Sequence, residues 1–329
     1  MAFRRAMQLA GEYEGATAPN PPVGCVLLDE AGHAIGAAAH QRAGQPHAEA
    51  MAIAACRAAG LLRRLHTVVV TLEPCNHTGR TPPCTQAILA TPAREIWIGA
   101  RDPNLHVAGG GAERLRENGC LVASIGSLGG VEAAELAASA ERLIAPFAKQ
   151  QRTGLPWVTV KQALDQEGGM IPVPGQKTFT STASLRLAHL LRRRADAILT
   201  GSGTVLADNP LFTVRHVPDF PGKIRRLIIL DRRGRVPPAY LEAVVARGMV
   251  ASIAKSIPDA FADLGRQGAF EVLVEAGPSV TRAIIEGGWC DEHVTIHQDG
   301  VAPDEDQVLV HRYGHEFSAA GVDNVLGHH

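Results

Sequence analysis

One histidine and two cysteines in this chain have the donor types and spacing of a catalytic zinc site. His47 lies in the tetrapeptide PHAE, and Cys75 and Cys84 follow it in EPC and PPC. Three protein donors leave the fourth position of tetrahedral zinc open for water, whereas four donors close a structural site. Zinc lowers the pKa of such a water to about 7, and the carboxylate of Glu49 can move its proton. These residues predict zinc-dependent hydrolytic deamination of a nucleobase.

The predicted elements place these residues at helix starts and after a strand end. Residues 45–59 are rich in Ala and Met after an entering proline, which predicts a helix with His47 and Glu49 in its first turn. The apolar, β-branched run TVVVTL predicts a strand buried on both faces that leads to Cys75. The run CTQAILA predicts a helix that begins at Cys84, where the positive helix end favours a thiolate.

The remaining cysteines are predicted to be buried without a function: Cys25 lies in an apolar run, Cys56 in the predicted helix after Glu49, and Cys120 and Cys290 near strand starts. Six cysteines in 329 residues, two of them assigned to metal, do not make a disulfide framework. The first residues lack the apolar core of a secretory signal, and no uncharged run is long enough to span a bilayer. We therefore expect a cytoplasmic protein without a membrane partner.

Composition predicts a globular protein of two domains, because the chain is 46% hydrophobic with a net charge of -1. There is no Lys/Arg excess to track phosphates, and aromatic residues make up only 4%. Both features argue against a nucleic-acid partner and favour a small pyrimidine substrate.

The chain is predicted to divide into domains at residues 1–148 and 149–329, with a polar, punctuated linker over 145–156. In each half, apolar strands alternate with helical runs, which predicts an α/β fold built on a layered sheet. The predicted strands are 23–28, 67–72, 94–100, 120–125, 157–164, 197–199, 226–230, 249–253, 270–274 and 293–296. A helix is predicted over 184–194.

A polar and basic insertion with two prolines separates Cys75 from Cys84, where the general deaminase signature has two residues. With this insertion, the segments TAPNPPVGCV, HQRAGQPHAEA, TLEPCNHTGRTPPC and ARDPN, in this order, resemble the deaminase half of the bifunctional riboflavin-biosynthesis deaminase/reductase family. The resemblance implies a cytidine-deaminase-like three-layer α/β/α domain that acts on a diaminopyrimidinone ribosylamino phosphate. It assigns zinc to the histidine and two cysteines, and proton transfer to Glu49.

The same resemblance implies substrate contacts in the deaminase half from Asn20, His40, His77, Gly79, Arg80, Asp102 and Asn104. For His40, a packed neutral histidine is the alternative interpretation. A homodimer or higher homo-oligomer is expected.

In the second half, LLRRRADAILTGSGTVLADNPLFTVR and VLVEAGPSVTRAII resemble the reductase half of that family, whose fold is similar to dihydrofolate reductase. The resemblance implies substrate contacts from Arg192, Phe212, Arg215 and Glu275, and NADPH contacts from Thr204 and Asp208. Phe212 stands in place of a leucine. The turn Gly277-Pro278-Ser279 precedes a predicted helix and would present backbone N–H groups to a cofactor phosphate.

Several segments depart from that pattern and predict weak or absent NADPH binding. Lys161 is followed by QALDQEGGMIPVPGQKTFTS, in which residues 176–178 replace a Ser-x-Trp, and Arg232 stands where a serine is common. The stretch after 293–298 also differs. One alternative is a paralogue with a degenerate reductase domain that serves a pyrimidine-derived secondary metabolite, such as the azapteridine toxoflavin. The other alternative is a non-catalytic, zinc-stabilised binding module. The presence of Glu49 argues against this alternative, because a structural zinc site needs no general acid or base.

Overall fold

The computed structural model describes residues 1–77, 82–103, 110–170, 180–298 and 306–313. The chain forms two compact units, Met1–Thr153 and Gly154–His329. Each unit has one mixed sheet. Within the described residues, no helix is long and apolar enough to cross a bilayer.

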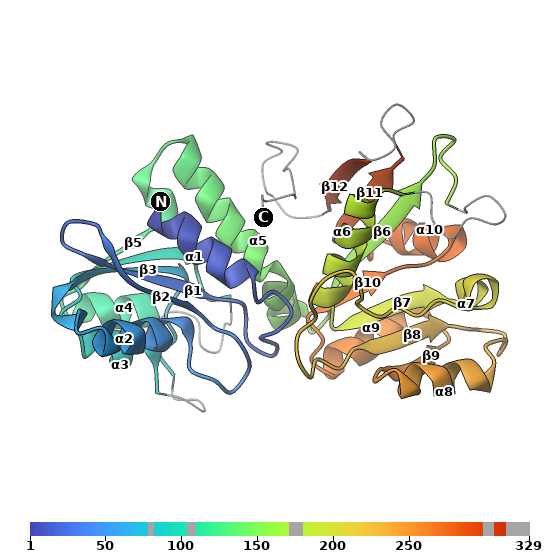
Figure 1. Ribbon diagram of the computed structural model, residues 1–329, viewed down its shortest axis with the longest axis horizontal. Helices are drawn as coiled ribbons and strands as arrows, with labels where there is room; N and C mark the ends of the chain where they lie inside the picture. The colour runs from blue at the N-terminus through green and yellow to red at the C-terminus, as the bar shows by residue number, and fades with distance from the viewer. Residues whose placement is uncertain (78–81, 104–109, 171–179, 299–305, 314–329) are drawn as a thin grey trace. The chain divides into compact units, whose positions relative to one another are not determined.

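The first unit is a five-stranded sheet with helices on both faces (Figure 1). The order is β2-β1-β3-β4-β5; β1 is antiparallel to β2 and β3, and β3, β4 and β5 are parallel. The strands are β1 Gly24–Asp29, β2 Ala34–Ala39, β3 Leu65–Leu72, β4 Glu95–Ala100 and β5 Leu121–Ser124. The helices are α1 Ala2–Gly11, α2 Ala48–Ala58, α3 Cys84–Leu89, α4 Gly111–Glu117 and α5 Val131–Thr153, with short 3-10 turns η1 Leu62–Arg64 and η2 Ile125–Leu128.

Two hydrophobic cores fill the two faces of this sheet. Successive strand residues point to opposite faces, so Val68 and Val70 of β3 pack with α2, α3 and α4, while Val69 packs with α1 and α5. This is why the run TVVVTL is apolar throughout. The three-layer α/β/α arrangement predicted for this half is confirmed.

The second unit has a seven-stranded sheet in the order β12-β11-β6-β10-β7-β8-β9. Within this second sheet, only the β11–β12 pair is antiparallel among the described strands. The strands are β6 Trp157–Leu164, β7 Ala197–Gly201, β8 Arg226–Leu230, β9 Val250–Ala254, β10 Glu271–Val274, β11 Glu292–His297 and β12 Gln307–Arg312. The helices are α6 Thr182–Arg194, α7 Ser202–Asp208, α8 Pro238–Ala246, α9 Ile257–Arg266 and α10 Pro278–Glu286.

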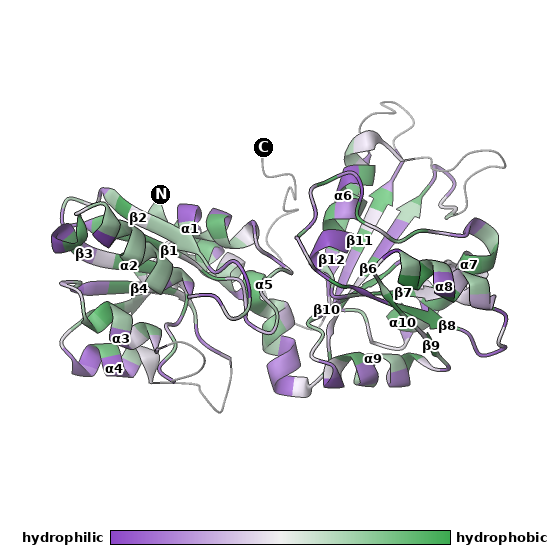
Figure 2. Cartoon of the chain, turned by 60° about the horizontal axis from the view of Figure 1, so that its bottom comes forward, coloured by the Kyte–Doolittle hydropathy of each residue, from purple (hydrophilic) through white to green (hydrophobic). Residues whose placement is uncertain are grey.

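Helices also cover both faces of this second sheet. Residues from α9 and α10 share one core with β6, β7 and β10, and residues from α7 and α8 form another core with β7 and β8. Figure 2 shows hydrophobic and hydrophilic residues alternating along α9, as expected for a helix with one face on a core.

The prediction from the sequence missed two strands, β2 and β12, and assigned part of a helix to a linker. β2 was missed because AIGAAA contains few residues with a preference for strands. β12, which pairs with β11, was also missed, although the sequence between the two strands contains the turn signals Asp-Gly and Pro-Asp. The prediction of a linker at 145–156 is wrong for residues 145–153, which belong to α5. This helix continues through Pro146, and its residues Phe147 and Ala148 are buried.

Candidate active site

The structure brings His47, Cys75 and Cys84 together. Nδ1 of His47 lies 3.3 Å from Sγ of Cys84 and 3.6 Å from Sγ of Cys75. The three donor atoms all lie within 4.8 Å of one another. One nitrogen and two sulfurs at these separations fit the donor set of a three-ligand zinc site.

His47 enters this site as the N-cap of α2 and not from its first turn. Its backbone is extended, with φ -70° and ψ 165°, and α2 starts at Ala48. The predicted helix therefore began too early, since an N-cap residue adopts non-helical angles. Cys75 follows the end of β3, and Cys84 is the first residue of α3 as predicted. The chain thus delivers each ligand from the end of a regular element.

The two thiols differ in pKa, and the pKa of Cys84 is raised where a helix start predicted that its thiolate would be favoured. The hydrogen bond from Cys84 lowers the pKa of Cys75 to about 4, whereas the same contact and burial raise the pKa of Cys84. α3 has only six residues, so its positive end is weak compared with these contacts. Metal binding requires both sulfurs as thiolates.

Glu49 lies in the first turn of α2, close to the metal ligands. Its side chain is 3% exposed, and burial raises its pKa. A carboxyl group with a raised pKa beside an open metal position suits proton transfer near neutral pH. Proton transfer by Glu49 stays a prediction, which this position allows.

Asn20 and His40 extend the site beyond the metal ligands. Nδ2 of Asn20 lies 3.1 Å from Nε2 of His40, and the rings of His40 and His47 meet edge to face at 5.1 Å. His40 is buried. Burial agrees with the interpretation of His40 as a packed histidine, and its contact with Asn20 can orient that residue; a substrate contact by His40 itself stays a prediction.

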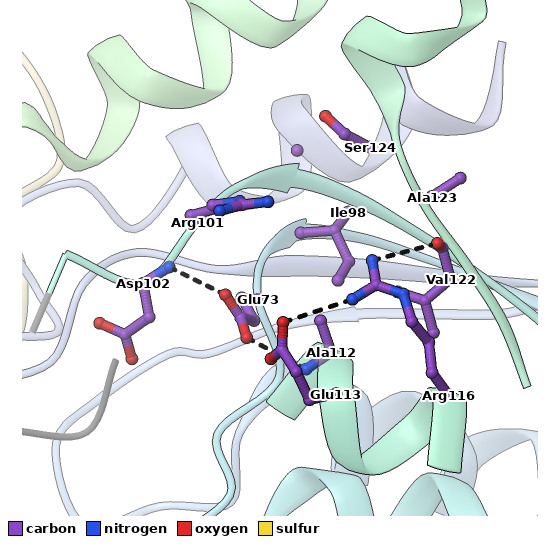
Figure 3. A pocket seen from close by; sticks show the side chains of 11 residues that line it. Glu73, Ile98, Arg101, Asp102, Ala112, Glu113, Arg116, Val122, Ala123 and Ser124 are labelled. Carbon is purple, nitrogen blue, oxygen red and sulfur yellow. Dashed lines mark hydrogen bonds and ion pairs between the residues drawn. The ribbon is translucent and has the colours of Figure 1, made fainter. Parts of the chain in front are cut away.

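Asp102 lies farther along the same sheet edge, at a pocket of about 260 Å³. Figure 3 shows the Glu73 carboxylate between two backbone N–H groups: Oε1 accepts from Ala112 at 3.0 Å and Oε2 from Asp102 at 3.5 Å. Sequence reasoning missed Glu73, which anchors the start of α4. His77 is exposed. The predicted contacts Gly79, Arg80 and Asn104 lie outside the described residues.

In the second unit, Glu275 is the centre of a buried ionic group. Its carboxylate accepts from Arg192 through Nε at 2.6 Å and Nη2 at 3.1 Å, and Nζ of Lys161 lies 3.5 Å away. Burial raises the pKa of Glu275, but Arg192 and Lys161 more than offset this and lower it. Lys161 was not predicted as a site residue, although a lysine inside the apolar strand WVTVKQAL is a signal.

The other predicted substrate contacts surround Arg192. Phe212 is buried at φ +55°, with its ring centroid 5.9 Å from the Arg192 guanidinium. Arg215 is exposed, and its backbone N–H donates to Nδ1 of His189 at 3.0 Å. His189 is fully buried and was also missed. A single sequence gave no sign that a histidine in α6 would hold the segment after α7.

The predicted cofactor contacts Thr204 and Gly277 also meet. The N–H of Gly277 donates to Oγ1 of Thr204 at 3.1 Å, which joins the start of α10 to α7. Pro278 is the first residue of α10, and Ser279 is exposed beside it. Asp208 ends α7 and is exposed. The divergent residues 176–178 lie outside the described residues.

Comparison with known proteins finds one family match in each of the two units. The cytidine and deoxycytidylate deaminase zinc-binding region matches residues 1–100, and the RibD C-terminal domain matches residues 156–298. Riboflavin biosynthesis protein RibD of Escherichia coli is 34% identical over 323 residues, covering 88% of this chain and 84% of the relative.

Two solved structures are similar over most of the chain. Acinetobacter baumannii RibD has a TM-score of 0.76 at 30% identity and covers 92% of this chain and 86% of its own. A Thermotoga maritima diaminohydroxyphosphoribosylaminopyrimidine deaminase/5-amino-6-(5-phosphoribosylamino)uracil reductase has a TM-score of 0.75 at 30% identity, with coverage of 90% and 85%. With a zinc-type donor set in a domain that matches the cytidine deaminase zinc-binding region and a second domain that matches the RibD C-terminal domain, the chain belongs to the RibD family of bifunctional deaminase/reductases of riboflavin biosynthesis.

Proposed function

We propose that the first unit deaminates 2,5-diamino-6-(5-phosphoribosylamino)pyrimidin-4(3H)-one, consuming water and releasing ammonia. The observation that carries this proposal is the convergence of His47, Cys75 and Cys84 beside the buried carboxylate of Glu49. Zinc bound by these three residues would supply hydroxide at neutral pH. Glu49 would take one proton from the attacking water and deliver it to the ring nitrogen. It would then take the second proton from the hydroxyl of the adduct and deliver it to the leaving amine, which departs as ammonia while the carbonyl forms.

The pyrimidine would be oriented by side chains on the same side of the sheet. In this proposal Asn20 hydrogen-bonds the base from a position set by His40. Asp102 and the loop that contains His77 contact the remainder of the substrate. The insertion between the two cysteines would contact the substrate and not the metal, since the metal ligands Cys75 and Cys84 flank the insertion and no residue of the insertion is needed as a ligand.

The second unit would reduce the ribosyl group of the deaminated product to a ribityl chain, with NADPH as hydride donor. Its residues fit a dinucleotide, because Thr204 accepts from the N–H of the N-cap Gly277 and so fixes the start of α10. Pro278 has no N–H, and the N–H groups of Ser279 and Val280 have no partner within the helix and can meet a phosphate. Arg192 and Arg215 bring two guanidinium groups to the substrate side, and a phosphate pairs well with such groups.

Residues 1–148 carry the deaminase and 149–329 the reductase in this proposal, and α5 continues across that boundary to Thr153. We also propose a cytoplasmic homo-oligomer. All six cysteines are free thiols, and the edge strand β9 exposes Val250 and Ile253, which supports burial against a second chain. Light scattering of the purified protein measures the oligomeric state.

The decisive experiment is incubation of the purified protein with the diaminopyrimidinone substrate, with and without NADPH, followed by mass spectrometry. Deamination without NADPH and ribityl product with it are expected. Deamination alone in both reactions would assign a degenerate reductase to the second unit. No ammonia release from zinc-loaded protein would overturn the deaminase assignment.

A further inference from the structure

His189 lies within α6, where its ring is fully buried and contacts the backbone of Arg215. Nδ1 of His189 accepts a hydrogen bond from the Arg215 N–H at 3.0 Å. Because an accepting ring nitrogen carries no hydrogen, the neutral ring has its hydrogen on Nε2. Burial, the largest effect, and the charges of Arg192 and Arg215 lower the pKa of His189 to about 4, so Nδ1 stays an acceptor at neutral pH.

The other ring nitrogen of His189 has no hydrogen-bond partner among the residues that the structure describes. Nε2 is buried, and the neighbouring ring of His216 meets the His189 ring edge to face at 4.6 Å. A buried donor without a partner is unfavourable, and leucine would fill similar space without that cost. Packing alone therefore explains a histidine here poorly. The contact that leucine could not make is the one between Nδ1 and the Arg215 backbone.

α6 holds the same segment at a second point. Arg192 is one turn along α6 from His189 and so lies on the same face of the helix. Nη1 of Arg192 donates to the carbonyl oxygen of Thr213 at 3.4 Å, and Nη1 of Arg215 donates to Oγ1 of Thr213 at 3.1 Å. Two backbone contacts with α6 thus fix residues 213–215, and with them the point where the Arg215 side chain leaves the chain.

The Arg215 side chain belongs to a group with surplus positive charge. Burial and then the charge of Arg192 lower the pKa of Arg215, whereas the charge of Glu275 raises it, so the three side chains share one neighbourhood. Nζ of Lys161 lies 3.5 Å from the same Glu275 carboxylate. Three cationic side chains beside one carboxylate favour a phosphate, and a guanidinium pairs with it best when its position is fixed.

We propose that His189 is a positioning residue of the reductase unit, whose Nδ1 fixes the Arg215 backbone and so directs the Arg215 guanidinium toward the substrate phosphate. This inference rests on the proposed reductase function, in which Arg192 and Arg215 lie on the substrate side. His189 acts through Arg215 and is not a catalytic residue. A contact that serves binding and not hydride transfer affects KM and leaves kcat unchanged.

The test is steady-state reduction of 5-amino-6-(5-phosphoribosylamino)uracil by the full-length protein at saturating NADPH. His189→Leu should raise the KM for this substrate about 10-fold and leave kcat and the NADPH affinity within about twofold, since one hydrogen bond is lost away from the reacting atoms. The urea midpoint of His189→Leu should not fall, because leucine brings no unpaired donor. A lower midpoint would make His189 a structural residue and overturn the proposal.

His189→Asn is the matched variant, because the asparagine Oδ1 and the histidine Nδ1 are both bonded to Cγ and both accept. It should keep the KM within about threefold of the unmodified protein. His216→Ala removes the neighbouring ring but not the acceptor, and should leave the KM within about twofold. A rise in KM for either variant equal to that of His189→Leu would assign the effect to packing and overturn the proposal.

A double-mutant cycle tests whether His189 acts through Arg215. Arg215→Ala should raise the same KM, and adding His189→Leu should change it less than about twofold further, because the guanidinium is already gone. An unchanged KM in His189→Leu, or additive losses in the cycle, would overturn the positioning role alone. Failure of the unmodified protein to reduce the substrate with NADPH would overturn the reductase function and this inference with it.

Discussion

The imidazole of His40 fixes the side-chain amide of Asn20. Nδ1 of His40 lies 3.2 Å from the carbonyl oxygen of Pro46, which can only accept, so Nδ1 carries the hydrogen. Burial, the largest effect, lowers the pKa of His40, and the neutral ring therefore offers Nε2 as acceptor to the Asn20 amide. The Asn20 amide oxygen is left free to accept a hydrogen bond from a substrate.

This relationship predicts that His40 and Asn20 act as one unit in substrate binding. His40→Leu and Asn20→Ala should each raise the KM for the pyrimidine about 10-fold, on the scale of one lost hydrogen bond in a buried site. The double variant should be little worse than either single variant, because each change already removes the same interaction. Steady-state kinetics on zinc-loaded proteins measures this coupling. Additive losses would show that His40 has a separate role.

The zinc site predicts that Cys75→Ser/Cys84→Ser loses its metal. Serine supplies no thiolate, and two of three protein donors would be removed. Elemental analysis after dialysis should show less than about one tenth of the zinc of the unmodified protein. Cys120→Ser is the control, since Cys120 is a free, half-buried thiol outside the site and should keep full zinc. Full zinc retention by the double variant would contradict the ligand assignment.

Glu49 is predicted to move protons without binding the metal. Glu49→Gln should retain its zinc and release ammonia about 100-fold or more slowly, the usual scale for loss of a general acid/base. Parallel measurement of zinc content and ammonia release separates the two roles. Near-normal turnover would place proton transfer on another residue, and zinc loss would make Glu49 a ligand.

Much of the deaminase site could be predicted from the sequence because its residues lie at the ends of local elements. Cys75 follows a strand that is apolar on both faces, and Cys84 starts a helix after two prolines. The error at His47 was small, since proline marks the approach to a helix but does not separate an N-cap from a first turn.

The reductase site was harder to predict because its contacts join distant segments. The Glu275 carboxylate is held by Arg192 and Lys161, and periodicity or spacing does not reveal such a pair. The resemblance supplied Arg192 and Glu275 but not Lys161. His189 was missed for the same reason, because its partner, the Arg215 backbone, lies 26 residues away.

The second unit also contains a buried ionic cluster remote in sequence from its proposed cofactor contacts. Glu292 of β11 is 4% exposed, and its carboxylate lies 2.9 Å from Nη2 of Arg194 and 2.8 Å from Nε of Arg312, its cross-strand neighbour. Arg194 also pairs with Glu271 at 2.6 Å. Burial raises the pKa of Glu292, but Arg194 and Arg312 more than offset this and lower it.

This cluster predicts acid sensitivity of the second unit. A carboxyl group whose folded pKa is below its unfolded pKa stabilises the fold above the unfolded value, and that contribution is lost as pH falls through the folded pKa. Glu292→Gln should therefore lower the free energy of unfolding by about 3 kcal/mol at neutral pH, because it removes the carboxylate paired with Arg312 and one of the two carboxylates paired with Arg194. The difference from the unmodified protein should shrink in acid, below the ordinary pKa of a glutamate, as the pH falls through the lowered pKa of Glu292 and this residue becomes protonated. Urea unfolding at the two pH values measures this, and Asp263→Asn, which removes the exposed Arg266 pair, should cost less than about 1 kcal/mol at both. An equal loss for Glu292→Gln at both pH values would show that packing, and not charge, makes this residue important.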